Sequence, residues 1–141
     1  KAQMGAGTHL PHEGRIFLSV KDADKTPALG AAARDLVSMG FSLVATAGTA
    51  EFLAAEGVES TRVNKVYEGR PNIVDRLKND DIAMVLNTTE GVQAIADSRE
   101  IRAVALYDKI PYFTTAAGSI AAVAAIKSRE EGEVGVRSLQ A

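Results

Sequence analysis

The strongest constraint on the fold is a regular alternation of short apolar runs with longer segments of helical character. The runs are rich in strand-forming residues and lie at 16–20, 41–45, 60–63, 82–86 and 111–113. Strands that alternate with helices at this spacing form a parallel sheet with right-handed crossovers. The run at 82–86 (IAMVL) is apolar throughout, which is typical of a strand covered on both faces. We therefore expect an α/β fold, a doubly wound three-layer sandwich around a mostly parallel five-stranded sheet.

Helical segments are expected between and after these runs. Thr26 is expected to cap the first helix, with Pro27 at its first position, where the missing N–H of proline has no intrahelical partner to lose. Gly40 is a natural end for that helix. The other helices are expected at 50–56, from Pro71 to about residue 77, at 92–107 and at 115–129. Residues 134–136 are expected to add a short last strand.

The composition argues against several classes of protein. The chain has 141 residues, about the size of one domain, with 16 Lys and Arg against 18 Asp and Glu and no Cys. Proteins that bind nucleic acid or a membrane surface usually carry a basic excess, so neither partner is expected. The lack of cysteine excludes disulfides and thiolate metal sites, and no metal site is expected. The longest mainly apolar stretch, at 114–126, is too short to span a bilayer, and we expect a cytoplasmic protein.

The first residues differ in character from the rest. Residues 1–14 contain three Gly, one Pro and both His, without a sustained period. We expect a linker or tail at 1–14 and one domain at 15–141. His9 and His12 are then tail residues rather than catalytic bases. Because the chain begins with Lys1 instead of Met, we expect a fragment or a processed product.

Hydroxyl, amide and ammonium groups gather where the expected strands end. In open parallel sheets, ligands bind beyond the carboxyl ends of the strands. Threonine hydroxyls and the free N–H groups of a helix N-terminus donate to anions, and lysines supply positive charge. Such a set suits a phosphorylated small molecule, although single Thr-Gly or Asn-Thr pairs are also common turn and cap residues. The candidate anion-binding residues are Lys25, Thr46, Thr49, Lys65, Asn87, Thr88, Thr89 and Thr114.

The same strand ends lack an obvious catalytic set. No Ser-His-Asp or Cys-His arrangement can be assembled, and neither a GxGxxG nor a GxxxxGK[ST] motif occurs. Glu90 is the acid nearest to the expected site, and a charged loop residue of this kind is usually solvated. Asp22 and Asp24 lie beside Lys25 and are expected to shape the loop rather than to ligate a metal. No catalytic residue is therefore assigned, and the inventory favours a binding protein.

Several motifs resemble one family in their order and spacing. They are GRIFLSVKDADK, GFSLVATAGTA, VNKVYEGRP, DRLKN and NTTEG followed by AIADSREIR. Together they resemble the carboxy-terminal domain of the large chain of carbamoyl-phosphate synthetase, over roughly residues 14–115. VNKVYEGRP with a downstream NTT is the specific combination, whereas ATAGTA alone is weaker. This domain is similar to methylglyoxal synthase in fold.

The resemblance implies an allosteric domain without catalysis or a cofactor of its own. In the bacterial family this domain binds UMP, an inhibitor, or IMP, an activator, while the ATP- and metal-dependent chemistry occurs in the preceding synthetase domains. The implied partners are those domains and the small glutaminase chain, and a homo-oligomer is possible. The implied phosphate contacts are Lys25, Thr46, Thr49 and Lys65. The rest of the effector pocket would be formed by Asn87, Thr88, Thr89, Ser98 and Ile101.

The family also binds the activator ornithine at the border with the preceding domain. The resemblance places that contact at Tyr112 and Thr114. Phe113 stands where the family has an aspartate, and a phenylalanine can neither accept a hydrogen bond from the amine of the ligand nor balance its charge. The ornithine contact is therefore expected to be altered in this chain.

Three alternatives remain open. A methylglyoxal synthase shares the threonine-glycine loop, but it needs an aspartate base with a histidine beside it in the site. This chain has Asn87, Thr88 and Thr89 there and no histidine after His12. The IMP cyclohydrolase half of the bifunctional purine enzyme shares the strand-loop and TxGTA patterns but lacks the pairing of VNKVYEGRP with NTT. A purely structural oligomerisation module would keep an unused pocket. Turnover of a triose phosphate tests the first alternative, and nucleotide binding tests the last.

Overall fold

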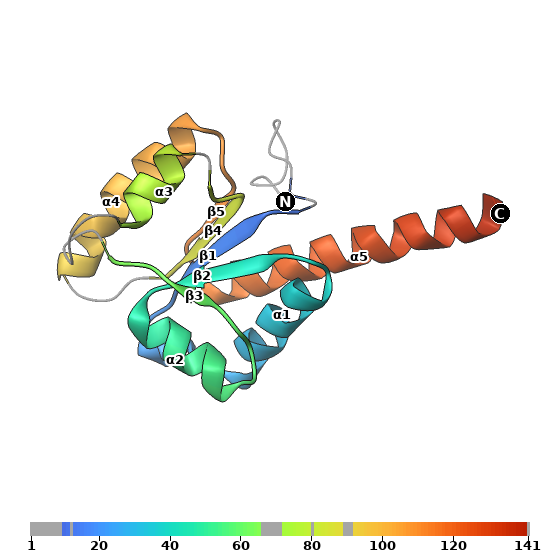
Figure 1. The fold of residues 1–141 in the computed structure, drawn as a ribbon, viewed down its shortest axis with the longest axis horizontal. Coiled ribbons are helices and arrows are strands. Elements are labelled where there is room, and N and C mark those ends of the chain that lie inside the picture. Colours follow the sequence, from blue (N-terminus) through green and yellow to red (C-terminus); the bar gives the residue numbers. More distant parts are fainter. Residues whose placement is uncertain (1–9, 12, 66–71, 80, 89–91, 141) are drawn as a thin grey trace.

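The computed structural model describes residues 10, 11, 13–65, 72–79, 81–88 and 92–140. Its strands are β1 (Arg15–Ser19), β2 (Ser42–Ala45), β3 (Thr61–Arg62), β4 (Met84–Asn87) and β5 (Tyr112–Phe113). Its helices are α1 (Pro27–Ser38), α2 (Ala47–Ala55), α3 (Ile73–Lys78), α4 (Val92–Tyr107) and α5 (Ala116–Gln140), with a 3₁₀ turn, η2, at Asp22–Asp24. Figure 1 shows the sheet between two layers of helices. The predicted α/β sandwich is confirmed.

The sheet is parallel throughout its described strands. Its order is β3-β2-β1-β4-β5. The central strand β1 pairs with β2 on one side, where Leu18 lies opposite Ala45, and with β4 on the other, where Ser19 lies opposite Asn87. The chain therefore winds outward from β1 twice, first through β2 and β3 and then through β4 and β5.

Each face of the sheet has its own hydrophobic cluster, because successive side chains of a strand point to opposite faces. One face is covered by α1, α2 and α5, and its buried residues include Ile16, Leu18, Leu36, Leu53 and Ile126. The other face is covered by α3 and α4, and its buried residues include Phe17, Val44, Val85, Ile73 and Ile101. The inner strands are thus apolar along their length because both of their faces are covered.

The end of the expected linker contacts the domain. Leu10 packs against the cluster on the α1, α2 and α5 face. The guanidinium of Arg129, on α5, donates to the carbonyl oxygens of Leu10 and Pro11 at 2.8 and 2.6 Å. These contacts tie residues 10 and 11 to α5, whereas a domain boundary at residue 15 stays a prediction.

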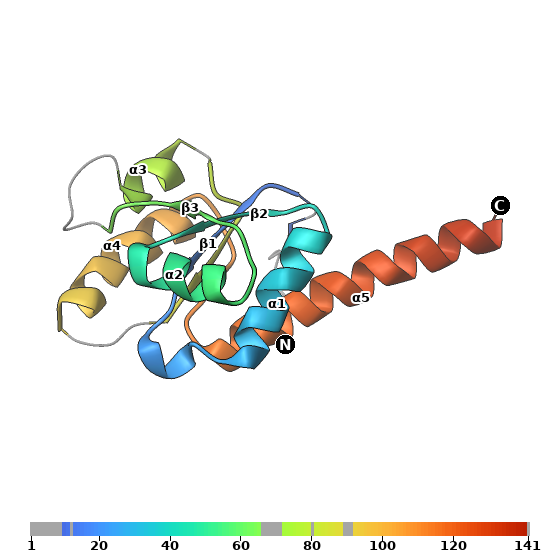
Figure 2. The ribbon, with the colours of Figure 1, turned by 60° about the horizontal axis from the view of Figure 1, so that its bottom comes forward.

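The expected last strand at 134–136 is wrong, because these residues belong to α5. The C-terminal part of α5 extends beyond the sheet in both ribbon views (Figures 1 and 2). A strand needs a neighbouring strand to satisfy its backbone groups, and the edge strands β3 and β5 are only two residues long. A helix satisfies those groups internally and tolerates a glycine at about 1 kcal/mol, so α5 continues through Gly132 and Gly135.

The boundaries of other helices also differ from expectation. Helix α2 begins at Ala47 rather than at residue 50, with Thr46 as its N-cap residue. Helix α3 begins after Asn72, whose side chain accepts the N–H groups of Val74 and Asp75. The expected start at Pro71 lies outside the described residues. Helix α4 is continuous over the expected range.

Truncation of Ile126 tests the packing of α5. Ile126→Ala should lower the free energy of unfolding by about 2–5 kcal/mol, because the side chain is fully buried and its loss leaves a cavity. Leu106→Ala, on α4, should change it by less than about 0.5 kcal/mol, because Leu106 is 77% exposed. Urea denaturation followed by circular dichroism measures both variants. Equally small effects would contradict the described packing of α5.

Candidate functional site

The two halves of the sheet diverge at the boundary between β1 and β4. The chain leaves β1 toward β2 on one side, whereas β4 leads to β5 on the other. The carboxyl ends of the strands at such a boundary are where ligands bind in open α/β sheets. We call the residues gathered at this edge the strand-end site; they are Ser19, Lys25, Thr46, Gly48, Thr49, Lys65, Asn87 and Thr88.

Two buried threonines hold the loop after β1. Thr49 Oγ1 accepts the backbone N–H of Val20 at 3.0 Å, and Thr88 Oγ1 accepts that of Lys21 at 3.0 Å. Both threonines are at most 5% exposed. A hydroxyl that accepts a hydrogen bond keeps its own hydrogen, so each can also act as a donor. The threonines therefore have a structural role in addition to any contact with a ligand.

The first turn of α2 lacks a side-chain cap. The hydroxyl of its N-cap residue, Thr46, lies 3.1 Å from Ser19 Oγ and 3.4 Å from Thr49 Oγ1, and it makes no capping hydrogen bond. In contrast, Thr26 caps α1 and Asn72 caps α3. The N–H groups of the first turn of α2 thus point toward the strand ends without a side-chain acceptor, where the helix dipole favours negative charge.

The ammonium of Lys25 lies at this uncapped turn. A Cβ atom on Gly48 would lie 3.2 Å from Lys25 Nζ, so the absence of a side chain at Gly48 leaves room for the ammonium. The side chain of Lys25 is 22% exposed and its Nζ pairs with Asp22 Oδ1 at 2.7 Å. Positive charge and free helix N–H groups are therefore side by side at the strand-end site.

A second lysine contributes to the same electrostatic field. Lys25 holds the pKa of Asp22 below its ordinary value, first through its hydrogen bond and then through its charge. The positive charge of Lys65 lowers that pKa further. Both lysines thus act on the carboxylate of Asp22, and Lys25 has the larger effect.

Asn87, at the end of β4, links helix α4 to strand β5 through its side-chain amide. Its amide nitrogen donates to Ser98 Oγ at 3.0 Å and to the hydroxyl of Tyr112 at 2.8 Å. The guanidinium of Arg102 lies 5.3 Å from the centre of the Tyr112 ring. Both amide hydrogens of Asn87 are used in these bonds, so its carbonyl oxygen is the part that can accept from a ligand.

Other predicted residues are placed differently. Ile101 is 5% exposed and packs in the hydrophobic cluster against α3, so it offers little surface to a ligand. Thr114 is exposed at the end of β5. Phe113 is buried in the cluster on the opposite face and presents no polar group. The predicted positions that lie outside the described residues are Thr89, Glu90, His9 and His12.

Sequence reasoning missed two members of the strand-end site, Ser19 and Gly48, and the ion pair between Asp22 and Lys25. Ser19 ends β1 and bonds Thr46, and Gly48 leaves the space that Lys25 uses. Asp22 pairs with Lys25 across one 3₁₀ turn. The i, i+3 spacing of Asp22 and Lys25 could have indicated this pair. Nothing local to Ser19 or Gly48 indicated their partners.

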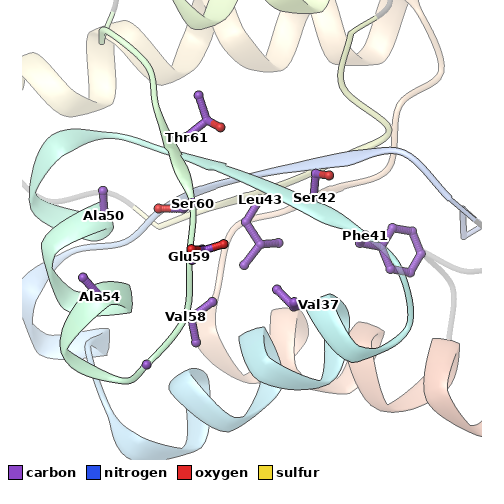
Figure 3. Close-up of a pocket in the computed structure, with 11 residues that line it drawn as sticks. Val37, Phe41, Ser42, Leu43, Ala50, Ala54, Val58, Glu59, Ser60 and Thr61 are labelled. Atoms are coloured by element: carbon purple, nitrogen blue, oxygen red, sulfur yellow. The ribbon is translucent and has the colours of Figure 1, made fainter.

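A separate hollow of about 770 Å³ lies near the start of β2 (Figure 3). The side chains around it come from the end of α1, the start of β2, α2 and the segment that leads into β3. Glu59 is its one charged lining residue, and the remainder includes Val37, Phe41 and Leu43. An acidic and largely apolar lining does not suit an anionic ligand, so we keep this hollow apart from the strand-end site.

Two further properties concern only the residues that the structure describes. None of the helices there is both long enough and apolar enough to cross a membrane. Within the same part of the chain, no three His, Cys, Asp or Glu side chains are grouped so that they could hold a metal ion.

Comparison with known families gives a direct match. The model of the MGS-like domain family matches residues 28–114, which contain much of the sheet and most of the strand-end site. The chain belongs to the MGS-like domain family. The crystal structure of methylglyoxal synthase from Elizabethkingia anophelis NUHP1 has a TM-score of 0.61 to this domain at 20% identity, over 81% of this chain and 79% of that one. The predicted methylglyoxal synthase-like fold is confirmed.

Curated relatives of this MGS-like domain are large chains of carbamoyl phosphate synthase. The domain is 50% identical over 140 residues, 99% of its length, to those of Brucella suis biovar 1 (strain 1330) and Myxococcus xanthus (strain DK1622). It is 52% identical over 134 residues, 95% of its length, to that of Pseudomonas syringae pv. tomato (strain ATCC BAA-871 / DC3000). The chain spans 12 to 13% of the length of these relatives. The predicted resemblance to this large chain is confirmed.

The ion pair of the strand-end site makes a testable prediction about pH. The Asp22 carboxyl should titrate below the ordinary range, and Lys25→Met should raise its pKa, because Lys25 is the main cause of the lowering. The pair favours the folded state above the unfolded Asp pKa of about 3.9, and this contribution is lost as the pH falls through the folded pKa. NMR titration of side-chain carboxyl carbons measures the pKa.

The matched control is Lys78→Met, which removes an exposed lysine at the end of α3. This variant should leave the pKa of Asp22 unchanged. If Lys25→Met also left it unchanged, the ion pair would be refuted.

Proposed function

We propose that this chain is the regulatory domain of a glutamine-hydrolysing carbamoyl phosphate synthase large chain and binds a nucleoside monophosphate at the strand-end site. UMP would act as an inhibitor and IMP as an activator. Identity of 50% to large chains of carbamoyl phosphate synthase supports the assignment of the domain. The observation that carries the binding site is the Lys25 ammonium beside the uncapped first turn of α2.

A phosphate group fits the chemistry of that position. The backbone N–H groups of Gly48 and Thr49 would donate to its oxygens, and the dipole of α2 would favour its negative charge. Lys25 and Lys65 would supply positive charge to it. The hydroxyls of Thr46 and Thr49 would also contact the phosphate.

The nucleoside would extend from the phosphate toward β4. Asn87 would accept a ribose hydroxyl or a base N–H through its carbonyl oxygen, because both hydrogens of its amide already bond Ser98 and Tyr112. Thr88 would line the same side, and a contact of Thr89 stays a prediction outside the described residues. Ile101 would not contact the nucleotide, because it is buried, and would only pack behind the residues that do.

Regulation would act through the rest of the enzyme. A nucleotide that binds one state of the enzyme better than another shifts the population toward that state. Such coupling is typically about 1–3 kcal/mol. Synthesis of carbamoyl phosphate for pyrimidine and arginine production would occur in the preceding synthetase domains with ATP and metal ions, and the small chain would supply ammonia from glutamine.

The ornithine contact would lie at Tyr112 and Thr114, without an acceptor at Phe113.

Calorimetric titration of the purified protein with UMP, IMP and inorganic phosphate tests this function. Saturable binding of UMP or IMP, tighter than that of phosphate, is expected. Dihydroxyacetone phosphate should be neither consumed nor converted to methylglyoxal. Failure of both nucleotides to bind, or turnover of the triose phosphate, would contradict the proposal.

Loss of one lysine should weaken nucleotide binding. Lys65→Ala should raise the Kd for the preferred nucleotide roughly tenfold to a hundredfold, since a hydrogen bond to a charged group contributes about 1.5–3 kcal/mol. Lys78→Ala removes an exposed lysine of α3 and should leave the Kd unchanged. Thermal unfolding of both variants checks that the fold is retained. Equal Kd values in the two variants would remove Lys65 from the site.

The variant Gly48→Ala should weaken nucleotide binding without lowering the stability of the fold. Gly48→Ala would place a Cβ 3.2 Å from Lys25 Nζ, which displaces the flexible ammonium rather than the backbone. We expect a higher Kd for the nucleotide with an unchanged or slightly higher melting temperature, since alanine favours a helix over glycine. Gly132→Ala, where no atom lies within 4 Å of the new methyl, is the control. A lower melting temperature together with normal binding would contradict the described geometry.

A further inference from the structure

The Lys25 ammonium at the proposed phosphate position already has an anionic partner. Asp22 Oδ1 lies 2.7 Å from Lys25 Nζ within the same 3₁₀ turn. The Asp22 side chain is 91% exposed, whereas that of Lys25 is only 22% exposed. The carboxylate of this ion pair is therefore open to solvent, whereas most of the Lys25 side chain is covered.

Asp22 also lies within the field of the second lysine. The pKa of Asp22 is lowered mainly by Lys25 and additionally by Lys65. The two cations that would attract a phosphate thus already act on one carboxylate of the chain itself. A phosphate ester has the same charge sign as this carboxylate and needs the same ammonium hydrogens.

The pairing and the exposure together have a consequence for affinity. We propose that Asp22 is a built-in competitor for the phosphate group, so that its pairing with Lys25 limits the affinity of the strand-end site. This inference rests on the proposed function and adds to it the residue that sets the strength of effector binding. An exposed ion pair is weak, so a phosphate displaces the carboxylate rather than being blocked by it.

The opposite role for Asp22 makes the test sharp. If Asp22 served to hold Lys25 in position for a ligand, its removal would loosen the lysine and weaken binding. If it competes, its removal frees the ammonium and also removes repulsion from the phosphate, which strengthens binding. The two roles predict changes of opposite sign.

The experiment compares Asp22→Asn with Asp24→Asn in calorimetric titrations with UMP, IMP and inorganic phosphate. Both variants remove one negative charge from the same 3₁₀ turn, and only Asp22 is paired with Lys25. Asp22→Asn should lower the Kd for the preferred nucleotide and for phosphate by about twofold to tenfold at low salt, the range expected for an exposed charge pair together with like-charge repulsion. Asp24→Asn should change the Kd less.

Two further comparisons complete the test: titrations at different salt concentrations, and the effect of Asp22→Asn in a protein that also carries Lys25→Met. The ratio of the Kd values of the unsubstituted protein and Asp22→Asn should approach one when salt is raised from about 0.1 to about 1 M, because the Debye length falls from about 10 to about 3 Å. The gain should also shrink in a Lys25→Met background. Unchanged or weaker binding by Asp22→Asn would overturn the competitor role and leave the nucleotide site intact. No binding of any ligand by either protein would overturn both proposals.

Discussion

The whole strand-end site depends on the parallel pairing of β1 with both β2 and β4. This pairing brings the carboxyl ends of the inner strands together and sets Ser19 directly opposite Asn87. The sheet order is β3-β2-β1-β4-β5, so β2 and β4 lie on opposite sides of β1. The loops that follow β1, β2 and β4 therefore come together at one edge of the sheet, although they are far apart in the sequence. The residues of the site therefore owe their proximity to hydrogen bonds of the sheet backbone.

Buried hydroxyls convert this proximity into a defined geometry. A buried polar group is unfavourable unless it is hydrogen-bonded, and Thr49 and Thr88 meet this condition by accepting backbone N–H groups of the loop after β1. Thr46 meets it by bonding Ser19 and Thr49, and its oxygen accepts no capping hydrogen bond from α2. These interactions thus stabilise the loops, while the N-terminus of α2 has no side-chain cap. This arrangement explains why a structural role for the threonines and a binding role are compatible.

Much of the fold could be predicted because its evidence is local. The strands appear as short apolar runs, and the N-cap residue of α1, Thr26, is followed directly by Pro27. The prediction failed at 134–136, where a Val-Gly-Val pattern has strand character but no sheet edge to pair with. It also placed the start of α2 too late, because Gly48 reads locally as a turn residue although Ala47 already begins the helix. Ile101 shows the same limit, since its neighbours on α3 are distant in the sequence.

The sequence by itself determined the order of strands and helices, the apolar faces of the inner strands, and the kinds of side chain at each strand end. These follow from the period of the pattern and the direction of the chain, which are local properties. Only the tertiary structure decided which of those ends meet and which partner each polar atom takes. Thr46 bonds Ser19 across the sheet edge, and Asn87 bonds Tyr112 of the outermost strand. Such partners are chosen by the packing of loops that are far apart in the chain, and so is the position of the Lys25 ammonium beside the uncapped first turn of α2.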